Sequence, residues 1–150
     1  MNHAHYMIQA LLEARAAAAR GEVPIGAVVV DTQSGAVLAA AGNETEQNND
    51  PTAHAEILAL QRACRIKGAP RLPECDLYVT LEPCPMCAAA LSFARIRRVY
   101  FGAYDPKGGG VEHGPKIFSH PTCHHKPDVY GGIEEQACAD ILKEFFRDKR

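Results

Sequence analysis

The sequence predicts an α/β fold, a sandwich of helices around a mixed sheet. Two observations lead to this prediction. A β-branched apolar run at Ile25–Val30, a turn at Thr32–Gly35 and a second strand at Val37–Ala41 form a hairpin. After the hairpin, helical and strand-like segments alternate, and a chain of 150 residues is long enough to bury about 70% of its unfolded surface. We therefore expect one domain over residues 1–150.

Two helices are expected in the first half of the chain. The first runs from about Tyr6 to Ala19, where apolar residues recur at helical spacing, and Gly21 ends it. The second is expected to open at Asp50, which is a plausible cap, with Pro51 in the first turn. That helix continues toward Gly68.

The second half continues the alternation. Strands are expected at Asp76–Thr80 and Arg98–Phe101, separated by a short helix that is entered through Pro83 and Pro85 and ends near residue 94. Residues 103–127 are rich in glycine, histidine and proline and favour no regular element. The chain closes with an amphipathic helix, whose apolar face consists of Cys138, Ile141, Leu142, Phe145 and Phe146.

The composition excludes several classes of protein. A hydrophobic fraction of 47% and a charged fraction of 23% exclude disorder, collagen and coiled coil as global descriptions. No apolar stretch of about 18 residues is present, and the N-terminus lacks a basic start followed by an apolar run, so neither a membrane partner nor a secretion signal is expected. A cytoplasmic, reduced setting is expected for the six cysteines, in which short spacing suggests metal binding.

The charge is uneven along the chain. The net charge is −2, yet residues 1–94 hold 6 basic and 10 acidic residues, whereas residues 95–150 hold 10 and 8. A polyanion would therefore sit against the second half. The candidates for phosphate binding there are Arg95, Arg97, Arg98, Lys107, Lys116, Lys126, Lys143, Arg147, Lys149 and Arg150.

Two short segments carry most of the chemistry. They are His54-Ala55-Glu56 and the segment from Pro83 to Cys87. Zinc accepts imidazole nitrogen and thiolate sulfur in tetrahedral geometry, and a catalytic zinc keeps one position for water. His54, Cys84 and Cys87 supply three ligands. With Glu56 as a neighbouring carboxylate that is not a ligand, this set indicates an open, catalytic metal.

The spacing supports the grouping. Cys84 and Cys87 lie about 60° apart around a helix axis, so they face one way. His54 and Glu56 would lie about 200° apart on a regular helix, so they share a site only beyond the helix N-terminus. We therefore predict that both helices aim their N-termini at the metal. Zinc lowers the pKa of bound water to about 7, and Glu56 can take that proton and deliver it to a leaving amine.

The combination of His-x-Glu with Pro-Cys-x-x-Cys is the signature of the zinc deaminases. Over nearly its whole length the chain resembles the bacterial tRNA-specific adenosine deaminases. The resemblance implies a cytidine-deaminase-like, three-layer α/β/α sandwich with a central mixed five-stranded sheet. It also implies one zinc ion per subunit of a homodimer, and conversion of the wobble adenosine in an arginine tRNA anticodon loop to inosine. The segments that carry it are Glu22–Val28, Asp50–Ile57, Tyr78–Cys84, Arg95–Val99, Phe101–Ala103, Asp105–Gly109 and Phe145–Arg147.

The same resemblance assigns roles to single residues. It implies that Asn43 hydrogen-bonds the flipped nucleoside and that Ile25 lines its pocket. It places Asp105 and Lys107 near the anticodon stem-loop. The last helix, with Phe146 and Arg147, would lie beside the RNA strand. No DNA partner is expected.

Two alternative functions stay open. A deaminase of free guanine or cytosine would use the same zinc chemistry, and the net charge of −2 favours it. A catalytically silent, zinc-stabilised module for RNA binding or dimerisation is the other alternative, and Glu56 argues against it.

The second cluster of histidines and cysteine, and three further cysteines, are expected to be structural. The spacing within His120–His125 permits a second metal site, but no carboxylate or distant partner completes it, so we expect a polar connection. Cys64, Cys75 and Cys138 are predicted to be small buried hydrophobes.

Overall fold

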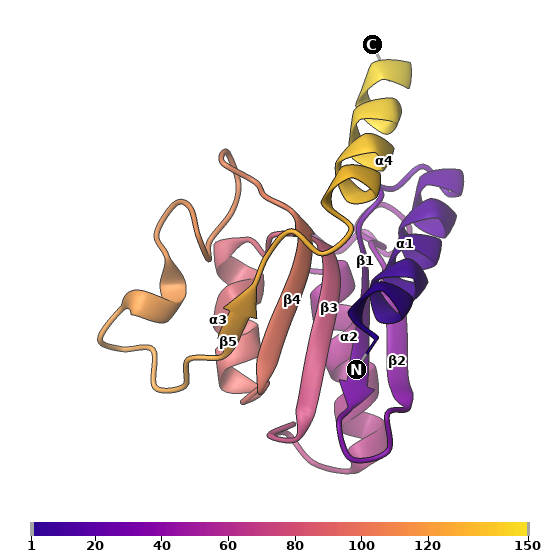
Figure 1. Cartoon of the computed structure of the whole chain (residues 1–150). Helices are drawn as coiled ribbons and strands as arrows, with labels where there is room; N and C mark the ends of the chain where they lie inside the picture. Colours follow the sequence, from indigo (N-terminus) through magenta and orange to yellow (C-terminus); the bar gives the residue numbers. More distant parts are fainter. Residues whose placement is uncertain (1, 150) are drawn as a thin grey trace.

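The computed structural model describes residues 2–149, and its centre is a five-stranded sheet in the order β2-β1-β3-β4-β5 (Figure 1). β1 (Gly26–Asp31) pairs antiparallel with β2 (Val37–Gly42) and with β3 (Cys75–Leu81). β4 (Arg98–Ala103) pairs parallel with β3 and with β5 (Asp128–Tyr130). The sheet is therefore mixed, and the carboxyl ends of β2, β3 and β4 reach the same edge.

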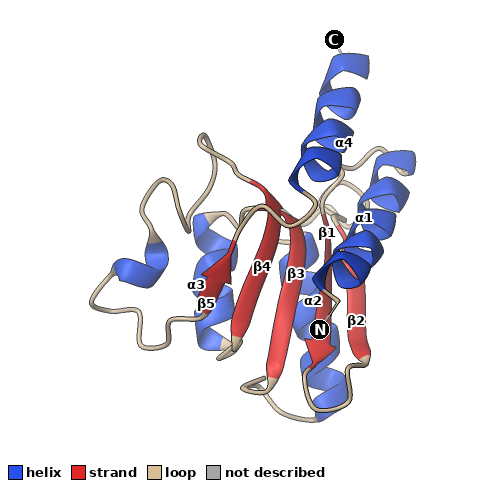
Figure 2. Ribbon diagram, viewed as in Figure 1, coloured by secondary structure: helices blue, strands red, loops and turns tan. Residues whose placement is uncertain are grey.

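Helices cover both faces of the sheet (Figure 2). α2 (Ala55–Lys67) and α3 (Pro85–Phe93) pack on one face, and α1 (His3–Ala19) and α4 (Glu135–Asp148) on the other. A short 3₁₀ helix, η1 (Ile117–Ser119), lies in the long connection after β4. The three-layer α/β/α sandwich with a mixed five-stranded sheet is confirmed.

The central strands are buried on both sides. Along β1, Ala27 and Val29 join the core under α2 and α3, whereas Val28 and Val30 join the core under α1. This alternation follows from the two-residue period of a strand. A strand covered on both faces is apolar throughout, as expected from its β-branched run.

The helix that was expected to open at Asp50 begins at Ala55 instead, so that part of the prediction is wrong. The Asp50 carboxylate accepts hydrogen bonds from the Thr52 amide (2.8 Å) and hydroxyl (2.7 Å), which closes a turn ahead of the helix. The amide of Ala55 donates to Oδ1 of Asn43 at 2.8 Å. The cap of α2 is thus supplied by a side chain at the end of β2.

Other differences lie in the second half. β5 was not among the expected strands. Of the apolar face expected for the last helix, Cys138 is buried, whereas Phe146 is 49% exposed, because the last turns of α4 extend past the sheet edge (Figure 1). Cys75 and Cys138 are buried as predicted, and Cys64 is half-buried against the core. Within residues 2–149, no helix is long and apolar enough to cross a bilayer.

Candidate metal centre and active site

The N-terminus of α2 presents His54 and Glu56 to one site. His54 is the N-cap and has extended backbone angles (φ −74°, ψ 152°), so the helical angle between the two residues does not apply. Glu56 lies in the first turn and is 3% exposed. Because the chain changes direction at His54, both side chains reach the space beyond the helix end.

The N-terminus of α3 brings the two sulfurs to the same space. Cys84 is the N-cap in extended conformation, Pro85 starts the helix, and the buried Cys87 lies in its first turn. Proline suits this position because it has no backbone N–H group that would need an acceptor, and because its φ is already helical. The amide-rich, positive end of α3 favours thiolate at Cys84.

The three predicted ligand residues lie together. Nδ1 of His54 is 3.7 Å from Sγ of Cys84 and 3.5 Å from Sγ of Cys87, and the three atoms lie within 4.8 Å of one another. A tetrahedral zinc with ordinary bond lengths separates a nitrogen ligand from a sulfur ligand by about 3.6 Å. The donor set and its spacing therefore fit zinc. Within residues 2–149 this is the one such group of three or more possible metal ligands.

The titrating groups of this cluster are strongly coupled. Hydrogen bonds from Cys87 and His54 lower the pKa of the Cys84 thiol to about 4. Cys87 donates its hydrogen to Cys84 and is buried, so its own pKa is raised. Burial is the main reason that the pKa of Glu56 is raised to about 7, and the neighbouring Cys84 sulfur adds to the effect. A carboxyl group with this pKa can both bind and release a proton near neutral pH.

Of the residues that the resemblance placed at the nucleoside, Asn43 lies closest to α2. It is buried, and its Oδ1 accepts the Ala55 amide, so the residue helps to fix the start of α2. Ile25 is half-buried against the core at the amino end of β1, on the same sheet edge.

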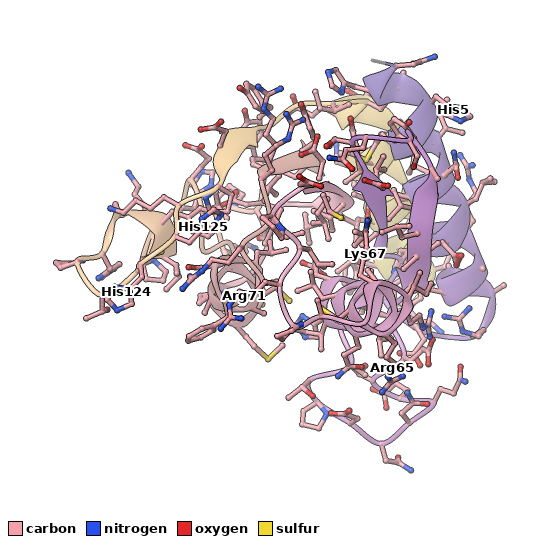
Figure 3. The ribbon with its side chains drawn as sticks, turned by 90° about the horizontal axis from the view of Figure 1, so that it is seen from below. His5, Arg65, Lys67, Arg71, His124 and His125 are labelled. Carbon is pink, nitrogen blue, oxygen red and sulfur yellow. The ribbon has the colours of Figure 1, made fainter. Side chains whose placement is uncertain are left out.

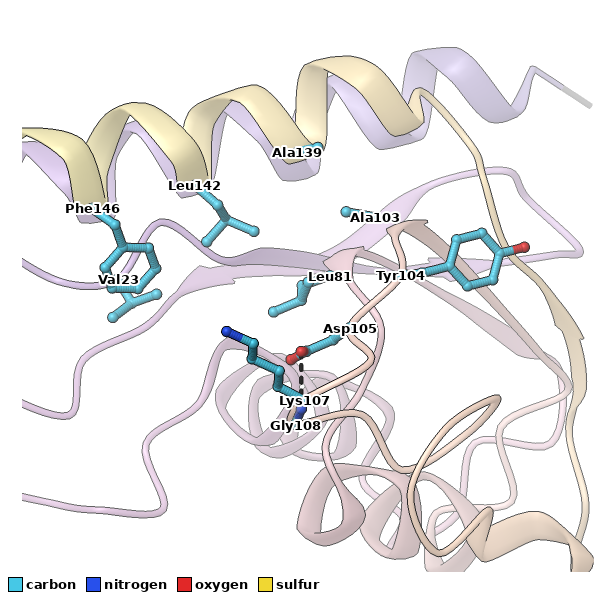
Figure 4. A pocket seen from close by; sticks show the side chains of 10 residues that line it. All are labelled: Val23, Leu81, Ala103, Tyr104, Asp105, Lys107, Gly108, Ala139, Leu142 and Phe146. Atoms are coloured by element: carbon cyan, nitrogen blue, oxygen red, sulfur yellow. Dashed lines mark hydrogen bonds between the residues drawn. The ribbon is translucent and has the colours of Figure 1, made fainter.

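Asp105, Lys107 and Phe146 lie together in one pocket of about 570 Å³ beneath α4 (Figure 4). Arg147 is not among its lining residues. The Arg147 guanidinium is highly exposed and lies 3.6 Å from Asp148. The other lining residues of this pocket, which we call the α4 pocket, are Val23, Leu81, Ala103, Tyr104, Gly108, Ala139 and Leu142.

Several basic candidates are engaged within the protein. Arg97 forms two hydrogen bonds with the buried Asp76, at 2.9 and 2.7 Å, and Arg98 lies 3.9 Å from Asp128. Basic side chains of the first half also gather at the opposite end of the sheet from the metal cluster, where Figure 3 shows Arg65, Lys67 and Arg71. Among residues 2–149, the charge asymmetry along the sequence therefore does not translate into one basic face, and the candidate Arg150 lies outside the described residues.

The cluster at residues 120–125, of which Figure 3 labels His124 and His125, makes contacts within the chain. Nε2 of His120 lies 2.6 Å from the Pro115 carbonyl, and Nε2 of His125 lies 2.6 Å from the Ile96 carbonyl. The His120 contact closes a local turn around η1, whereas the His125 contact ties the connection after η1 to the residue before β4.

Sequence reasoning gave no role to two buried carboxylates beside the site. Glu22 accepts hydrogen bonds from the Thr45 hydroxyl and from the amides of Glu46 and Gln47. Glu82 accepts five hydrogen bonds from the connection after β4. Burial alone would raise the pKa of each carboxyl, but these hydrogen bonds keep both pKa values below the ordinary range. An acidic residue at the end of an apolar strand was the available signal for Glu82.

Comparison with known proteins places the chain. The family model described as MafB19-like deaminase matches residues 1–150. A tRNA-specific adenosine deaminase of Agrobacterium fabrum is 62% identical over 97% of this chain and 95% of that protein. A protein of the same description from Bacillus subtilis is 43% identical over 97% of this chain and 89% of that protein.

Solved structures agree with the sequence relatives. A structure from a study of A-to-I editing by tRNA:A34 deaminases has a TM-score of 0.89 and 62% identity, and covers 92% of this chain and 99% of its own. A guanine deaminase of Bacillus subtilis has a TM-score of 0.68 and 34% identity, over 87% and 85% of the two chains. The chain thus belongs to the MafB19-like deaminase family, in which its full-length relatives include tRNA-specific adenosine deaminases.

Proposed function

We propose that this chain is a zinc-dependent enzyme that deaminates adenosine to inosine at the wobble position of a tRNA, with the anticodon stem-loop of an arginine tRNA as substrate. The observation that carries the proposal is the grouping of His54, Cys84 and Cys87 with the buried carboxyl of Glu56 beside them. The 62% identity to a tRNA-specific adenosine deaminase supports the choice of substrate.

In this proposal a side chain of the protein, that of Glu56, transfers the protons of the reaction. A zinc ion held by His54, Cys84 and Cys87 would supply Lewis acidity and lower the pKa of a water molecule to about 7. Glu56 takes the proton of the attacking water on its carboxylate and returns it to the amino group that leaves carbon 6. Burial raises the pKa of the Glu56 carboxyl, which suits both transfers near neutral pH, and the same burial keeps bulk water from competing.

The substrate has to present one base outside the helical stack, which a single-stranded anticodon loop does at low cost. We assign the recognition of the flipped nucleoside to Asn43 and Ile25. The α4 pocket, with Asp105, Lys107 and Phe146, would receive the neighbouring part of the loop. Lys107 offers a cation to phosphate, and Phe146 offers a ring face for stacking. Arg147, at the exposed surface of the same helix, would contact the RNA backbone.

We also propose a homodimer of single-domain subunits, each with one zinc ion, in the cytoplasm where tRNA is modified. The apolar side chains on the outer surface of α3 support the homodimer. Met86 and Phe93 lie seven residues apart on this helix and are 36% and 77% exposed, and Ile66 on the neighbouring α2 is 63% exposed. Exposed apolar side chains gathered on adjacent helices mark an interface.

The test is to load the protein with zinc, incubate it with an arginine tRNA anticodon stem-loop, and measure inosine. We expect inosine from the native enzyme and none from Glu56→Ala, which should keep its zinc and fold. No inosine from the zinc-loaded native protein would refute the proposed substrate. Inosine from Glu56→Ala would refute the role of Glu56.

Deamination of a free base is the second candidate, and the 34% identical guanine deaminase of Bacillus subtilis favours it. Guanine and cytosine are incubated with the same zinc-loaded protein, and the release of ammonia is measured. A higher kcat/KM for either base than for the stem-loop would favour this candidate. A zinc-loaded protein that binds the stem-loop but turns over nothing would be the silent RNA-binding module.

A further inference from the structure

The carboxylate of Glu82 is enclosed by one segment of the chain, residues 104–113, which we call the anchored loop. Oε1 accepts the Asp105 amide at 3.0 Å and Nδ1 of His113 at 2.8 Å. Oε2 accepts the amides of Val111, Glu112 and His113, at 3.3, 2.9 and 3.0 Å. The Glu82 side chain is fully buried, so these five donors replace the water that would otherwise solvate its charge.

The anchored loop also packs directly on the turn that carries the metal ligand Cys84. The amide of Gly110 donates to the Pro83 carbonyl at 2.8 Å, and a Cβ atom at Gly110 would lie 2.5 Å from the nitrogen of Pro85. A Cβ atom at Gly109 would collide with Oε2 of Glu82. Both glycines are therefore needed for the loop backbone to approach this closely.

The far side of the same loop forms a wall of the α4 pocket. Asp105 accepts the Gly108 amide on Oδ1 and the Gly109 amide on its carbonyl, each at 2.9 Å, which closes a tight turn around Lys107. The turn begins at Asp105, whose own amide donates to Oε1 of Glu82. The position of Lys107 in the pocket (Figure 4) therefore depends on the bond between Asp105 and Glu82.

We propose that Glu82 is a positioning residue for RNA binding, which holds the anchored loop so that Asp105 and Lys107 face the anticodon loop at a fixed place relative to the metal turn. This inference rests on the proposed function. Glu82 touches neither the reacting base nor a ligand atom in this scheme. Its loss is therefore expected to weaken the binding of the polymer while leaving the chemical step intact.

Two variants test the inference from opposite sides. Glu82→Gln keeps the shape of the side chain but replaces one carboxylate oxygen by an NH2 group. This donor would face the amide donors of the loop and could not accept their hydrogen bonds. Gly109→Ala leaves the carboxylate in place and pushes the loop away from it. For both variants we expect KM for the stem-loop to rise by about tenfold or more. We expect kcat and the zinc content to equal those of the native enzyme.

Asp31→Asn is the matched control, because Asp31 likewise accepts an amide and a hydroxyl, from Gln33 and Ser34, in the hairpin after β1. We expect its KM to equal that of the native enzyme. Stem-loop affinity is measured separately in a Glu56→Ala background, where no turnover occurs. There the Glu82→Gln and Gly109→Ala substitutions should raise Kd by the same factor as KM.

Unchanged KM and Kd in both variants would overturn the inference. Loss of zinc or of the fold in both would also overturn it, because Glu82 would then serve the metal turn or the core. Failure of the proposed function has a different signature, since the native enzyme itself would then yield no inosine. Stem-loop binding by the Glu56→Ala protein would still report on Glu82 in that case.

Discussion

At the scale of single residues, Cys84 and Cys75 offer a direct comparison. Both are cysteines close to the sheet, but Cys84 lies 3.7 Å from Nδ1 of His54, whereas Cys75 is buried in the core. We expect Cys84→Ala to lower the affinity for zinc by more than 100-fold, beyond the roughly 10–100-fold cost of losing a residue that only supports a ligand. Cys75→Ala should keep one zinc per chain. Metal analysis after dialysis against a weak chelator measures both, and zinc retained by Cys84→Ala would contradict the assignment.

Glu22 gives the second prediction for a single residue. Its pKa is below the ordinary value of 4.5, because three hydrogen bonds outweigh its burial. A lowered pKa in the folded state means that the ionised carboxylate stabilises the fold above about pH 4.5. That contribution is lost as the pH falls through the folded-state pKa. We therefore expect Glu22→Gln to cost about 1–3 kcal/mol at pH 7, and less at pH 3 to 4, in urea unfolding. An equal cost at both pH values would show that the charge is not responsible.

At the scale of elements, the attachment of α4 depends on one glycine of β4. A Cβ atom at Gly102 would collide with the side chain of Cys138 and lie 2.8 Å from the Thr80 carbonyl. We expect Gly102→Ala to lift α4 from the sheet, to lower the free energy of unfolding by about 1–3 kcal/mol, and to leave zinc binding intact. Hydrogen exchange of the α4 amides measures the loosening. Adding Cys138→Ala removes the sulfur and should restore part of the protection. No rescue would locate the strain at the two contacts that remain, with the Cβ atom of residue 138 and with the Thr80 carbonyl.

The start of α2 shows what a sequence can and cannot predict about an element. Asp50 followed by Pro51 has the local signature of a helix start, but the Asp50 carboxylate is used by Thr52. The actual cap comes from Asn43, which lies twelve residues before Ala55. A hydrogen bond across that distance has no local signal. β5 escaped prediction for the same reason, since its three residues form a strand only through pairing with β4.

At the scale of the whole molecule, the outer surface of α3 predicts self-association. Phe93 is 77% exposed on this helix, whereas Leu12, 57% exposed, lies on α1 at the other face of the sheet. We expect the native protein to sediment with twice the mass of one chain, Phe93→Glu to sediment as a monomer, and Leu12→Glu to remain a dimer. Sedimentation velocity distinguishes these states. A native monomer would refute the proposed homodimer.

The grouping of His54, Cys84 and Cys87 was predictable because each of the two motifs lies at a helix start, and both helix starts face the same space. The α4 pocket was not, because Val23, Leu81, Tyr104 and Leu142 come from four separate parts of the chain. Its assembly depends on where α4 packs against the sheet. The resemblance placed Asp105, Lys107 and Phe146 near the RNA, and packing brings those three into the pocket and leaves Arg147 outside it.

The carboxyl ends of β2, β3 and β4 reach one sheet edge, and this has an evolutionary consequence. The segment after β2 holds Asn43, and the segment after β3 holds Cys84. The segment after β4 contributes neither a metal ligand nor a proton carrier to the proposed mechanism. Insertions or substitutions in residues 104–113 can therefore change the substrate from one polymer to another, or to a small metabolite. The chemical step would survive such changes, because the acid at position 82 holds this segment in place and takes no part in the reaction itself.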